Sequence, residues 1–284
     1  MTGTGVQADP FIVDNWPDFV TAAGTSGAYV AFPTTPGVID MNDVAPGGVE
    51  ETTVRCANIQ GNGWAVRNLY CAGDNVFRAV GNVSVSDLHF LNFYVDFQNE
   101  NNKFFWNQGL NYLETSLIGC QFSGELHSFA SSQNVGLFGN SGYSSFIRRY
   151  RCALNVKLDN SCALFYASGT SNTNNNLSFT TIKLSGNSEK NIAGDYINCL
   201  FTGKSKAAEA AITYNGRSNF NVFDVDFKEA AAFSCSAPSG SLNLINSDKL
   251  PAGAVIGTGF VGVTTAQLGD AAYLASLGFP IAEE

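Results

Sequence analysis

Seven short segments of this chain resemble one another, and this self-similarity limits its fold more than any single residue does. Each segment carries an aliphatic, aromatic or cysteine side chain at every second position, which is typical of a β-strand with one buried face. The segments are residues 88–93, 117–124, 150–156, 182–186, 196–203, 222–227 and 242–246. Phe90 and Phe122 are 32 positions apart, as are Cys120 and Cys152. Strand repeats of roughly 20 to 32 residues predict a β-solenoid, in which each unit buries its apolar face against its neighbours.

The composition is consistent with such a repeat. Hydrophobic residues make up 45% of the 284 residues and charged residues only 14%. Asparagine clusters at 99–102 and 172–176 suit sharp corners, because asparagine tolerates left-handed backbone and hydrogen-bonds to nearby main chain. An all-β sandwich is the alternative fold, but it needs hairpin turns, and only Asn62-Gly63 and Asn215-Gly216 have a favoured hairpin sequence.

Charge and hydropathy exclude several function classes. The net charge of −9 and pI near 4.7 argue against a nucleic-acid-binding surface, which requires a basic stripe. No apolar run is long enough to predict a membrane span. Arg148, Arg149 and Arg151 form the one basic cluster. We expect these arginines on an outward strand edge beside carboxylates, and contact with an acidic sugar or a partner's acidic patch is the alternative.

The first ten residues have neither the positive charge nor the apolar stretch of a secretory signal peptide. We therefore expect synthesis in a bacterial cytoplasm. Release by lysis, inside a virus particle, is one route by which such a protein would leave the cell.

The seven cysteines do not indicate a metal site. Their number is odd, no Cys-x-x-Cys pair occurs, and His89 and His127 are the only histidines. Cys120, Cys152 and Cys199 occupy the same place in their repeats, which predicts an inward column of free thiols. We expect no metal and no cofactor.

Both ends of the chain have helical signals that would cover the terminal strands of a solenoid. Asn15 is a candidate N-cap for a front helix whose apolar face includes Trp16 and Phe19. Thr264 is a candidate N-cap for a back helix with an apolar stripe, which Gly278 ends. The expected organisation is an N-terminal segment and capping helix (1–33), a β-solenoid (34–260) and a C-terminal helical cap (261–284).

Several motifs resemble known repeat proteins. Residues 59–69, Ile-Gln-Gly-Asn-Gly-Trp-Ala-Val-Arg-Asn-Leu, resemble a coil of right-handed parallel β-helix proteins of the pectin-lyase-like type. Residues 136–139 (Gly-Leu-Phe-Gly), followed by Cys152, resemble the glycine-rich β-solenoid repeats of bacterial surface proteins, and residues 264–279 resemble the end of such arrays. From Asp9-Pro10 onward the chain is similar to β-helical proteins of tailed phages and prophages of gut Firmicutes.

This resemblance implies an all-β fold, a single-stranded right-handed parallel β-helix with short capping helices at both ends. It also implies a non-enzymatic structural or display component of a phage virion, such as a capsid decoration, head fibre or tail spike. Its expected partners are other virion proteins and host-surface glycans. Rods of this kind commonly associate side by side about a symmetry axis, so we expect a homo-oligomer, and specifically a trimer.

β-Helices also include polysaccharide depolymerases, which use pairs of carboxylates. Asp224 and Asp226 form the best pair, because residues two apart on a strand point to one face, and Asp195 and Glu125 are candidate partners. The Gly-His-Gly motif of polygalacturonases and the Trp-x-Asp-His motif of pectate lyases are absent. We expect the two aspartates to be structural and the chain to have no catalytic residues. A depolymerase and a bacterial surface adhesin are the alternatives.

Exposed aromatic side chains suggest a further function, which is glycan binding. The side chains that could stack on sugar rings are Trp64, Tyr94, Trp106, Tyr112, Tyr143 and Tyr214. Residues 104–106, Phe-Phe-Trp, should not all be buried, because neighbouring strand residues point to opposite faces. We expect an exposed patch there that contacts another subunit. The candidate partner or glycan contacts are Phe104, Phe105, Trp106, Tyr112, Tyr143, Arg148, Arg149 and Arg151.

Overall fold

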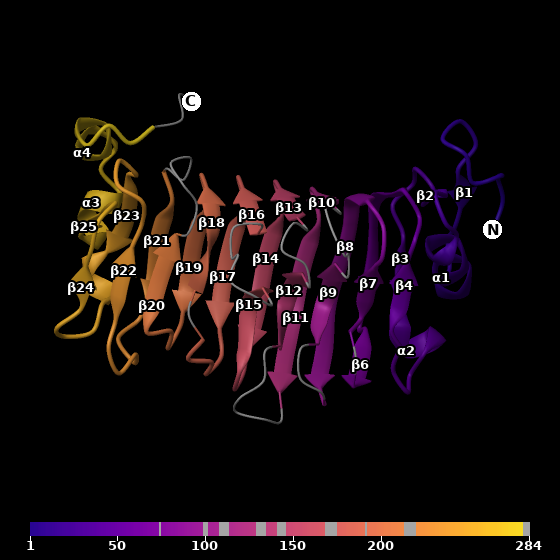
Figure 1. Cartoon of the computed structure of the whole chain (residues 1–284), viewed down its shortest axis with the longest axis horizontal. Coiled ribbons are helices and arrows are strands. Elements are labelled where there is room, and N and C mark those ends of the chain that lie inside the picture. The colour runs from indigo at the N-terminus through magenta and orange to yellow at the C-terminus, as the bar shows by residue number, and fades with distance from the viewer. Residues whose placement is uncertain are drawn as a thin grey trace.

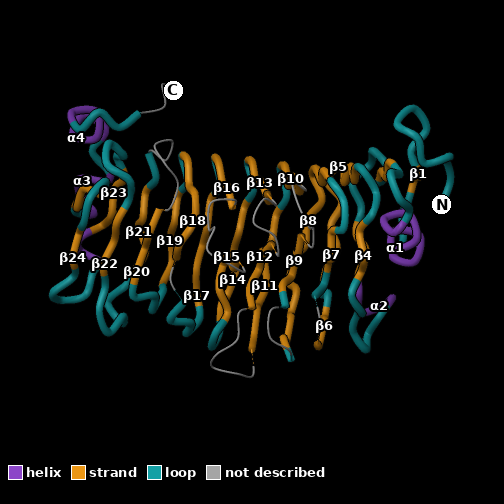
Figure 2. The backbone as a smooth tube through the Cα atoms, viewed as in Figure 1, coloured by secondary structure: helices purple, strands orange, loops and turns teal. Residues whose placement is uncertain are grey.

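The computed structural model describes residues 1–73, 75–98, 102–107, 114–128, 135–140, 146–167, 175–190, 192–212 and 220–280. The structure is mostly β, with 51% strand and 11% helix. The strands stack side by side along the longest axis of the molecule, from the N-terminal end to the C-terminal end (Figure 1). Within these ranges the helices lie toward the two ends (Figure 2). None of the helices found in these ranges has the length and apolar character needed to cross a bilayer.

The strands are short except for β5 and β8. They are β1 (Phe11–Ile12), β2 (Tyr29–Ala31), β3 (Val38–Asp40), β4 (Thr52–Val54), β5 (Asn58–Arg67), β6 (Tyr70–Gly73), β7 (Phe77–Ala79), β8 (Val83–Phe97), β9 (Lys103–Asn107), β10 (Glu114–Ile118), β11 (Gln121–Ser128), β12 (Val135–Asn140), β13 (Phe146–Tyr150), β14 (Ala153–Leu158), β15 (Cys162–Ala167), β16 (Asn175–Ser178), β17 (Thr181–Ser185), β18 (Ile192–Ile197), β19 (Leu200–Lys204), β20 (Glu209–Ile212), β21 (Val222–Asp226), β22 (Ser234–Ser236), β23 (Asn243–Asn246), β24 (Val255–Ile256) and β25 (Phe260–Val263). The helices are α1 (Trp16–Gly24), α2 (Met41–Val44), the 3-10 turn η1 (Ser247–Lys249), α3 (Thr265–Leu268) and α4 (Ala271–Ser276).

Neighbouring strands pair in parallel throughout the described residues. Val85, Leu117 and Arg149 are register partners on β8, β10 and β13, each 32 residues after the last. The step between register partners is not constant, and it falls to 17 residues from Leu244 to Val261. Parallel pairing at such steps excludes the antiparallel sandwich and is compatible with an all-β parallel solenoid.

A sharp corner divides the strands that the sequence predicts as single segments. Residues 117–124, 150–156 and 196–203 each form the end of one strand and the start of the next. At the bend one residue has positive φ, and the residues with this conformation are Asp87 (49°), Gly119 (66°), Arg151 (53°), Phe179 (50°), Asn198 (53°) and Phe220 (66°). The left-handed conformation turns the chain within one residue, so the alternating pattern passes through the corner without a visible break.

The residue after each corner points into the core and forms a column. Cys120, Cys152 and Cys199 hold three of these places, are buried and carry free thiols, which confirms the predicted column. Their Sγ atoms donate to carbonyl oxygens of the preceding level at 3.4 to 3.6 Å. Burial raises the pKa of Cys199 to about 12. Asn221 and Asn243 continue the column on the later levels.

Alternate residues on the following strands fill the core. Phe90 stacks on Phe122 at a ring distance of 5.5 Å, so the predicted 32-residue register is confirmed at this pair. Phe201 and Phe223 stack at 4.3 Å with their planes 6° apart. Parallel in-register strands place side chains of one kind directly above one another, which allows such stacking along the axis.

The two ends differ from each other. Asn15 caps α1 as predicted, and Phe19 of α1 is buried against Phe32 and Phe77. The expected single back helix is instead two short helices, α3 and α4, because Gly269 ends the first and Asp270 caps the second. Neither helix has a fully buried residue, but Leu268 of α3 and Leu274 of α4 are half-buried.

Candidate functional site

The candidate site is the outward surface of β8, β11, β14, β17 and β19, which we call the polar face. Side chains alternate on these strands, so Phe122 points into the core while Gln121 and Ser123 point outward. The same alternation places Asn155 on β14 and Lys183 on β17 in the column that contains Ser123. Polar side chains therefore form continuous rows that run across the strands.

A groove of ≈ 500 Å³ crosses the polar face. Its lining residues are Leu91, Gln121, Phe122, Ser123, Ala153, Leu154, Asn155, Thr181, Ile182, Lys183, Leu200 and Thr202. Most of the polar lining groups are amides and hydroxyls, which can both donate and accept hydrogen bonds. The volume lies within the range typical of small-ligand sites.

Four charged or ionisable side chains, which we call the ionic group, lie beside the groove on the same face. They are Glu125 and His127 on β11, Lys157 on β14, and Asp159 just after β14. Lys157 Nζ lies 3.0 Å from Glu125 Oε2 and 3.1 Å from Asp159 Oδ2. His127 Nε2 lies 3.1 Å from Glu125 Oε2, and its Nδ1 lies 3.4 Å from Asp159 Oδ2. The group is therefore a closed network in which each carboxylate contacts both basic side chains.

Hydrogen bonds and ion pairs shift the pKa values of side chains in the ionic group, and burial shifts that of a neighbouring carboxyl group. The hydrogen bond from Lys157, with a second from His127, lowers the pKa of Glu125. The hydrogen bond to Glu125, reinforced by Asp159, raises the pKa of Lys157. Burial raises the pKa of Asp96, which is on β8 in register with His127.

Stacked aromatic rings extend the ionic group along the face. The rings of Tyr94 and His127 are 4.6 Å apart at an angle of 24°, and those of Tyr70 and Tyr94 are 5.9 Å apart. Tyr94 is 41% exposed. Tyr70 on β6 and His127 on β11 lie on opposite sides of its ring, so the outer edge with the hydroxyl is the part that is open to solvent. An exposed, fixed tyrosine hydroxyl can hydrogen-bond to a sugar.

The ionic group also has the residue types of a metal site. Ligand atoms of Glu125, His127 and Asp159 lie within 4.8 Å of one another. However, the Lys157 ammonium contacts both carboxylates, so it already supplies the positive charge between them. A metal ion would have to displace Lys157, and this arrangement therefore favours an internal ion-pair network.

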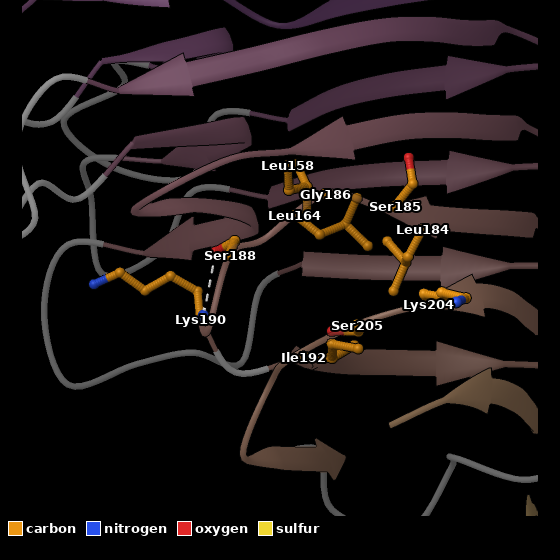
Figure 3. A pocket seen from close by; sticks show the side chains of 10 residues that line it. All are labelled: Leu158, Leu164, Leu184, Ser185, Gly186, Ser188, Lys190, Ile192, Lys204 and Ser205. Atoms are coloured by element: carbon orange, nitrogen blue, oxygen red, sulfur yellow. Dashed lines mark hydrogen bonds between the residues drawn. The ribbon is translucent and has the colours of Figure 1, made fainter. Parts of the chain in front are cut away.

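A second, much smaller cavity lies near β17, β18 and β19 and is drawn in Figure 3. Its volume of ≈ 10 Å³ is close to the minimum for one water molecule. The Ser188 hydroxyl donates to the Cys162 carbonyl and accepts from the Lys190 N–H, while the Lys190 side chain extends away from the other labelled residues (Figure 3). This cavity has no room for an organic ligand.

The predicted pair Asp224 and Asp226 does point to one face of β21. Asp224 Oδ1 forms an ion pair with Lys249 at 2.8 Å and accepts a hydrogen bond from Asn246 at 2.6 Å. Asp226 accepts from the backbone N–H of Lys228. Both carboxylates therefore make local contacts that stabilise the fold.

The expected partners of this pair do not come near it. Asp195 is buried in β18. Glu125 is on β11, four strand spacings from β21, which corresponds to roughly 19 Å. The structure does not bring the four carboxylates together.

The expected exposed patch at residues 104–106 is wrong for two of its three members. Phe104 is 0% exposed and Phe105 is 2% exposed. Phe104 packs on Phe93 at 4.6 Å, and Phe105 stacks on Phe77 at 5.7 Å. Both rings also contact Phe77, so both belong to the aromatic core despite the expected alternation, and Trp106 is the partly exposed member of the three.

The arginine cluster is also divided by the fold. Arg148 is exposed and pairs with Glu114 at 3.2 Å, and exposed Arg151 lies over the Tyr150 ring. Arg149 is buried with its guanidinium 4.3 Å from the Phe138 ring centre, and burial lowers its pKa to about 9. The prediction of an outward Arg149 is therefore wrong, because alternation turns it inward between its two neighbours. The candidate contacts Tyr112 and Tyr143 lie outside the described residues.

Sequence reasoning missed most of the ionic group. Glu125 was expected only as a distant partner of another pair, and His127, Lys157 and Asp159 were not singled out. The signal was available, because Lys157 follows Glu125 by the same 32 positions that separate Phe90 from Phe122. Extending the repeat from apolar to charged positions would have paired these residues.

Comparisons with known proteins add no assignment. No protein-family model matches the chain, and no curated protein or solved structure matches it. The function must therefore be inferred from the polar face itself.

Proposed function

We propose that this chain is a non-enzymatic display protein that contacts glycans through its polar face. In this proposal the parallel strands form one single-stranded right-handed β-helix, which acts as a rigid support. The chain is a structural component of a phage particle, held by other virion proteins and associated with copies of itself. The virion placement rests on the resemblance of the sequence to phage β-helical proteins.

The groove beside exposed Tyr94 is the observation that carries the glycan proposal. Amide and hydroxyl side chains such as Gln121, Asn155 and Thr181 match the hydroxyl groups of a saccharide. Tyr94 lies on the same face and presents its exposed hydroxyl, which can hydrogen-bond to a sugar. Polar groups in the groove and on the tyrosine form a binding surface that needs no chemical step.

The internal pairing of the ionic group supports a non-catalytic role. Glu125 and Asp159 both contact Lys157, so each carboxylate is engaged in an internal ion pair. The low pKa of Glu125 keeps it ionised at neutral pH, which is unfavourable for a general acid.

An array of bacterial surface glycans, probed with the labelled full-length chain, tests this function. We expect binding that Tyr94→Ala weakens by about threefold to tenfold, the range expected for loss of one hydrogen bond worth roughly 0.5 to 1.5 kcal/mol. Tyr150→Ala is the matched control, because Tyr150 is 38% exposed, similar to Tyr94, but is the last residue of β13 and does not lie on the polar face. Absence of any glycan binding, or equal loss in both variants, would refute the proposal.

The virion placement and the self-association have their own tests. Mass spectrometry of purified phage particles from the host that encodes the chain should detect it. Sedimentation analysis of the purified chain should show an oligomer. Absence from the particles together with a monomeric state would contradict the structural role.

One observation favours depolymerase activity as a second function. Asp96 has a raised pKa and Glu125 a lowered pKa, and they lie on adjacent strands of the polar face. Two carboxyl groups with opposite shifts are the usual arrangement of a general acid and a base or nucleophile in glycosidases. Release of oligosaccharides by the wild type, lost in both Asp96→Asn and Glu125→Gln, would establish this second function in place of the first.

A further inference from the structure

The charge of the groove differs from that of the whole chain. Acidic residues outnumber basic ones by 24 to 15, yet the groove is lined by no carboxylate. Lys183 is the single charged residue in its lining. An acidic protein thus has a locally positive groove.

Lys183 is surrounded by neutral side chains. Its register partners on β14 and β19 are Asn155 and Thr202, and Thr181 and Ser185 are the outward residues next to it on β17. Lys183 forms no ion pair within the described part of the chain. Its charge is therefore not compensated within the face.

Two other lysines on the polar face differ from Lys183 in this respect. Lys157 pairs with both carboxylates of the ionic group. Lys204 lies in register with Asp226 on β21, so a carboxylate faces it across the strands. Lys183 is therefore the one of these three lysines whose strand neighbours are all neutral.

We propose that the groove binds a saccharide chain that carries anionic groups, and that Lys183 contacts the anion. This inference rests on the proposed glycan-binding function and specifies its ligand class. The amide of Asn155 and the hydroxyls of Thr181 and Thr202 lie next to the ammonium and hydrogen-bond the sugar. A carboxylate on a uronic acid and a phosphodiester in a cell-wall polymer present the same chemistry to one lysine.

The geometry sets the length of the ligand that this groove accepts. The groove is lined by residues of β8, β11, β14, β17 and β19, and four strand spacings of about 4.8 Å give about 19 Å. A short oligosaccharide lying along the stacking axis fits this length and places one of its anionic groups at Lys183. A nucleic acid is not a candidate, because one lysine on a chain of net charge −9 cannot neutralise a phosphate backbone.

Calorimetric titration of the full chain with matched oligosaccharides tests the inference. The probes are a neutral oligosaccharide, its carboxylated counterpart and a phosphodiester-bearing counterpart. At low salt we expect at least one anionic probe to bind about tenfold more tightly than the neutral one, and added salt to reduce this difference. The stronger of the two anionic probes identifies the source of the ligand.

Substitutions of Lys183 separate the effect of its charge on binding from the effect of its size and shape. Lys183→Gln should reduce binding of the anionic probe to the level of the neutral probe, while Lys183→Arg should keep the preference. Lys228→Gln makes the same charge change at an exposed lysine outside the groove and should leave binding unchanged.

Four results would overturn the inference. Equal binding of neutral and anionic saccharides, or an unchanged preference in Lys183→Gln, would refute it while leaving the glycan-binding proposal in place. Binding of an acidic peptide as tight as that of the anionic saccharide would show that the groove recognises charge alone. Failure to bind any saccharide would refute the proposed function as well.

Discussion

Replacing Asn221 with alanine should destabilise the back half of the molecule more than any surface change. Asn221 is fully buried in the column that begins with the cysteines. Its amide donates to the Tyr196 carbonyl at 2.7 Å and to Asn243 Oδ1 at 2.8 Å, and its oxygen accepts from the Cys199 N–H at 2.9 Å. One side chain thus connects three levels of the stack.

The magnitude follows from the groups that lose this partner. Asn221→Ala removes one partner from each of three buried polar groups, and each loss costs about 1 to 3 kcal/mol. Partial relaxation around the smaller side chain reduces the sum, so we expect a loss of about 3 to 5 kcal/mol in the free energy of unfolding. Asn155→Ala is the control, because Asn155 is exposed on the polar face and should change stability by less than about 0.5 kcal/mol.

Urea titration followed by far-UV circular dichroism measures this loss. Because stacked repeats can unfold from one end, hydrogen exchange of peptides from β18 to β23 provides a local readout. Asn221→Asp adds a pH test, since a carboxylate facing the two acceptors has a raised pKa in the fold. The destabilisation caused by Asn221→Asp should therefore be largest at neutral pH. It should decrease as the pH falls and the new carboxyl group is protonated. A loss below about 1 kcal/mol in Asn221→Ala, with unchanged exchange, would refute the role of the column.

Three further predictions concern the corner, the polar face and the thiols. Arg151→Gly should stabilise the protein by roughly 1 kcal/mol in urea titrations, because glycine adopts the positive φ of 53° without strain. A loss of stability would show that the contact of the arginine with the Tyr150 ring outweighs the backbone strain. Asp96→Asn should stabilise the fold at pH 7, because burial raises the pKa of Asp96 and its ionised form opposes folding. This gain should disappear as the pH falls below about 4, and an equal gain at both pH values would exclude the ionisation as its cause. Cys120, Cys152 and Cys199 should react with a thiol reagent only after denaturation, and rapid labelling of the native protein would contradict their burial.

The sequence repeat was sufficient to predict the parallel pairing of the central strands. Phe90 and Phe122, and the cysteines that follow each corner, could be aligned because parallel in-register stacking places like side chains above one another. The front helix was also predictable, because Asn15 caps it locally without help from distant residues.

Features that depend on packing against residues far away in the sequence were not predictable. Alternation implied an exposed Phe105, but a neighbouring strand provides Phe77 as a stacking partner on that side. The split of the back helix follows from the second cap, Asp270, which competes with the continuous apolar stripe. Hydrophobic patterns show which side chains share a face, but they do not show what lies against that face.

The candidate site was only partly predictable for the same reason. Tyr94 was among the aromatic residues expected to stack on sugars, and it is exposed on the polar face. The pairing of Glu125 with Lys157 required the repeat to be extended to charged residues, whose outward positions tolerate many side chains. The groove is a property of several strands together and has no signature within any one of them.

The unequal steps between register partners affect how the chain reaches its fold. Closing a 32-residue step instead of a 19-residue step costs only roughly 0.5 kcal/mol of extra chain entropy, so long and short steps can be mixed in one stack of parallel strands at little cost. Each new strand needs only the preceding strand as a template, and α1 packs at the front from within the first 24 residues. Folding can therefore proceed strand by strand from the N-terminus while the ribosome is still synthesising the later strands, and an insertion between two strands delays only the pairing of the later one.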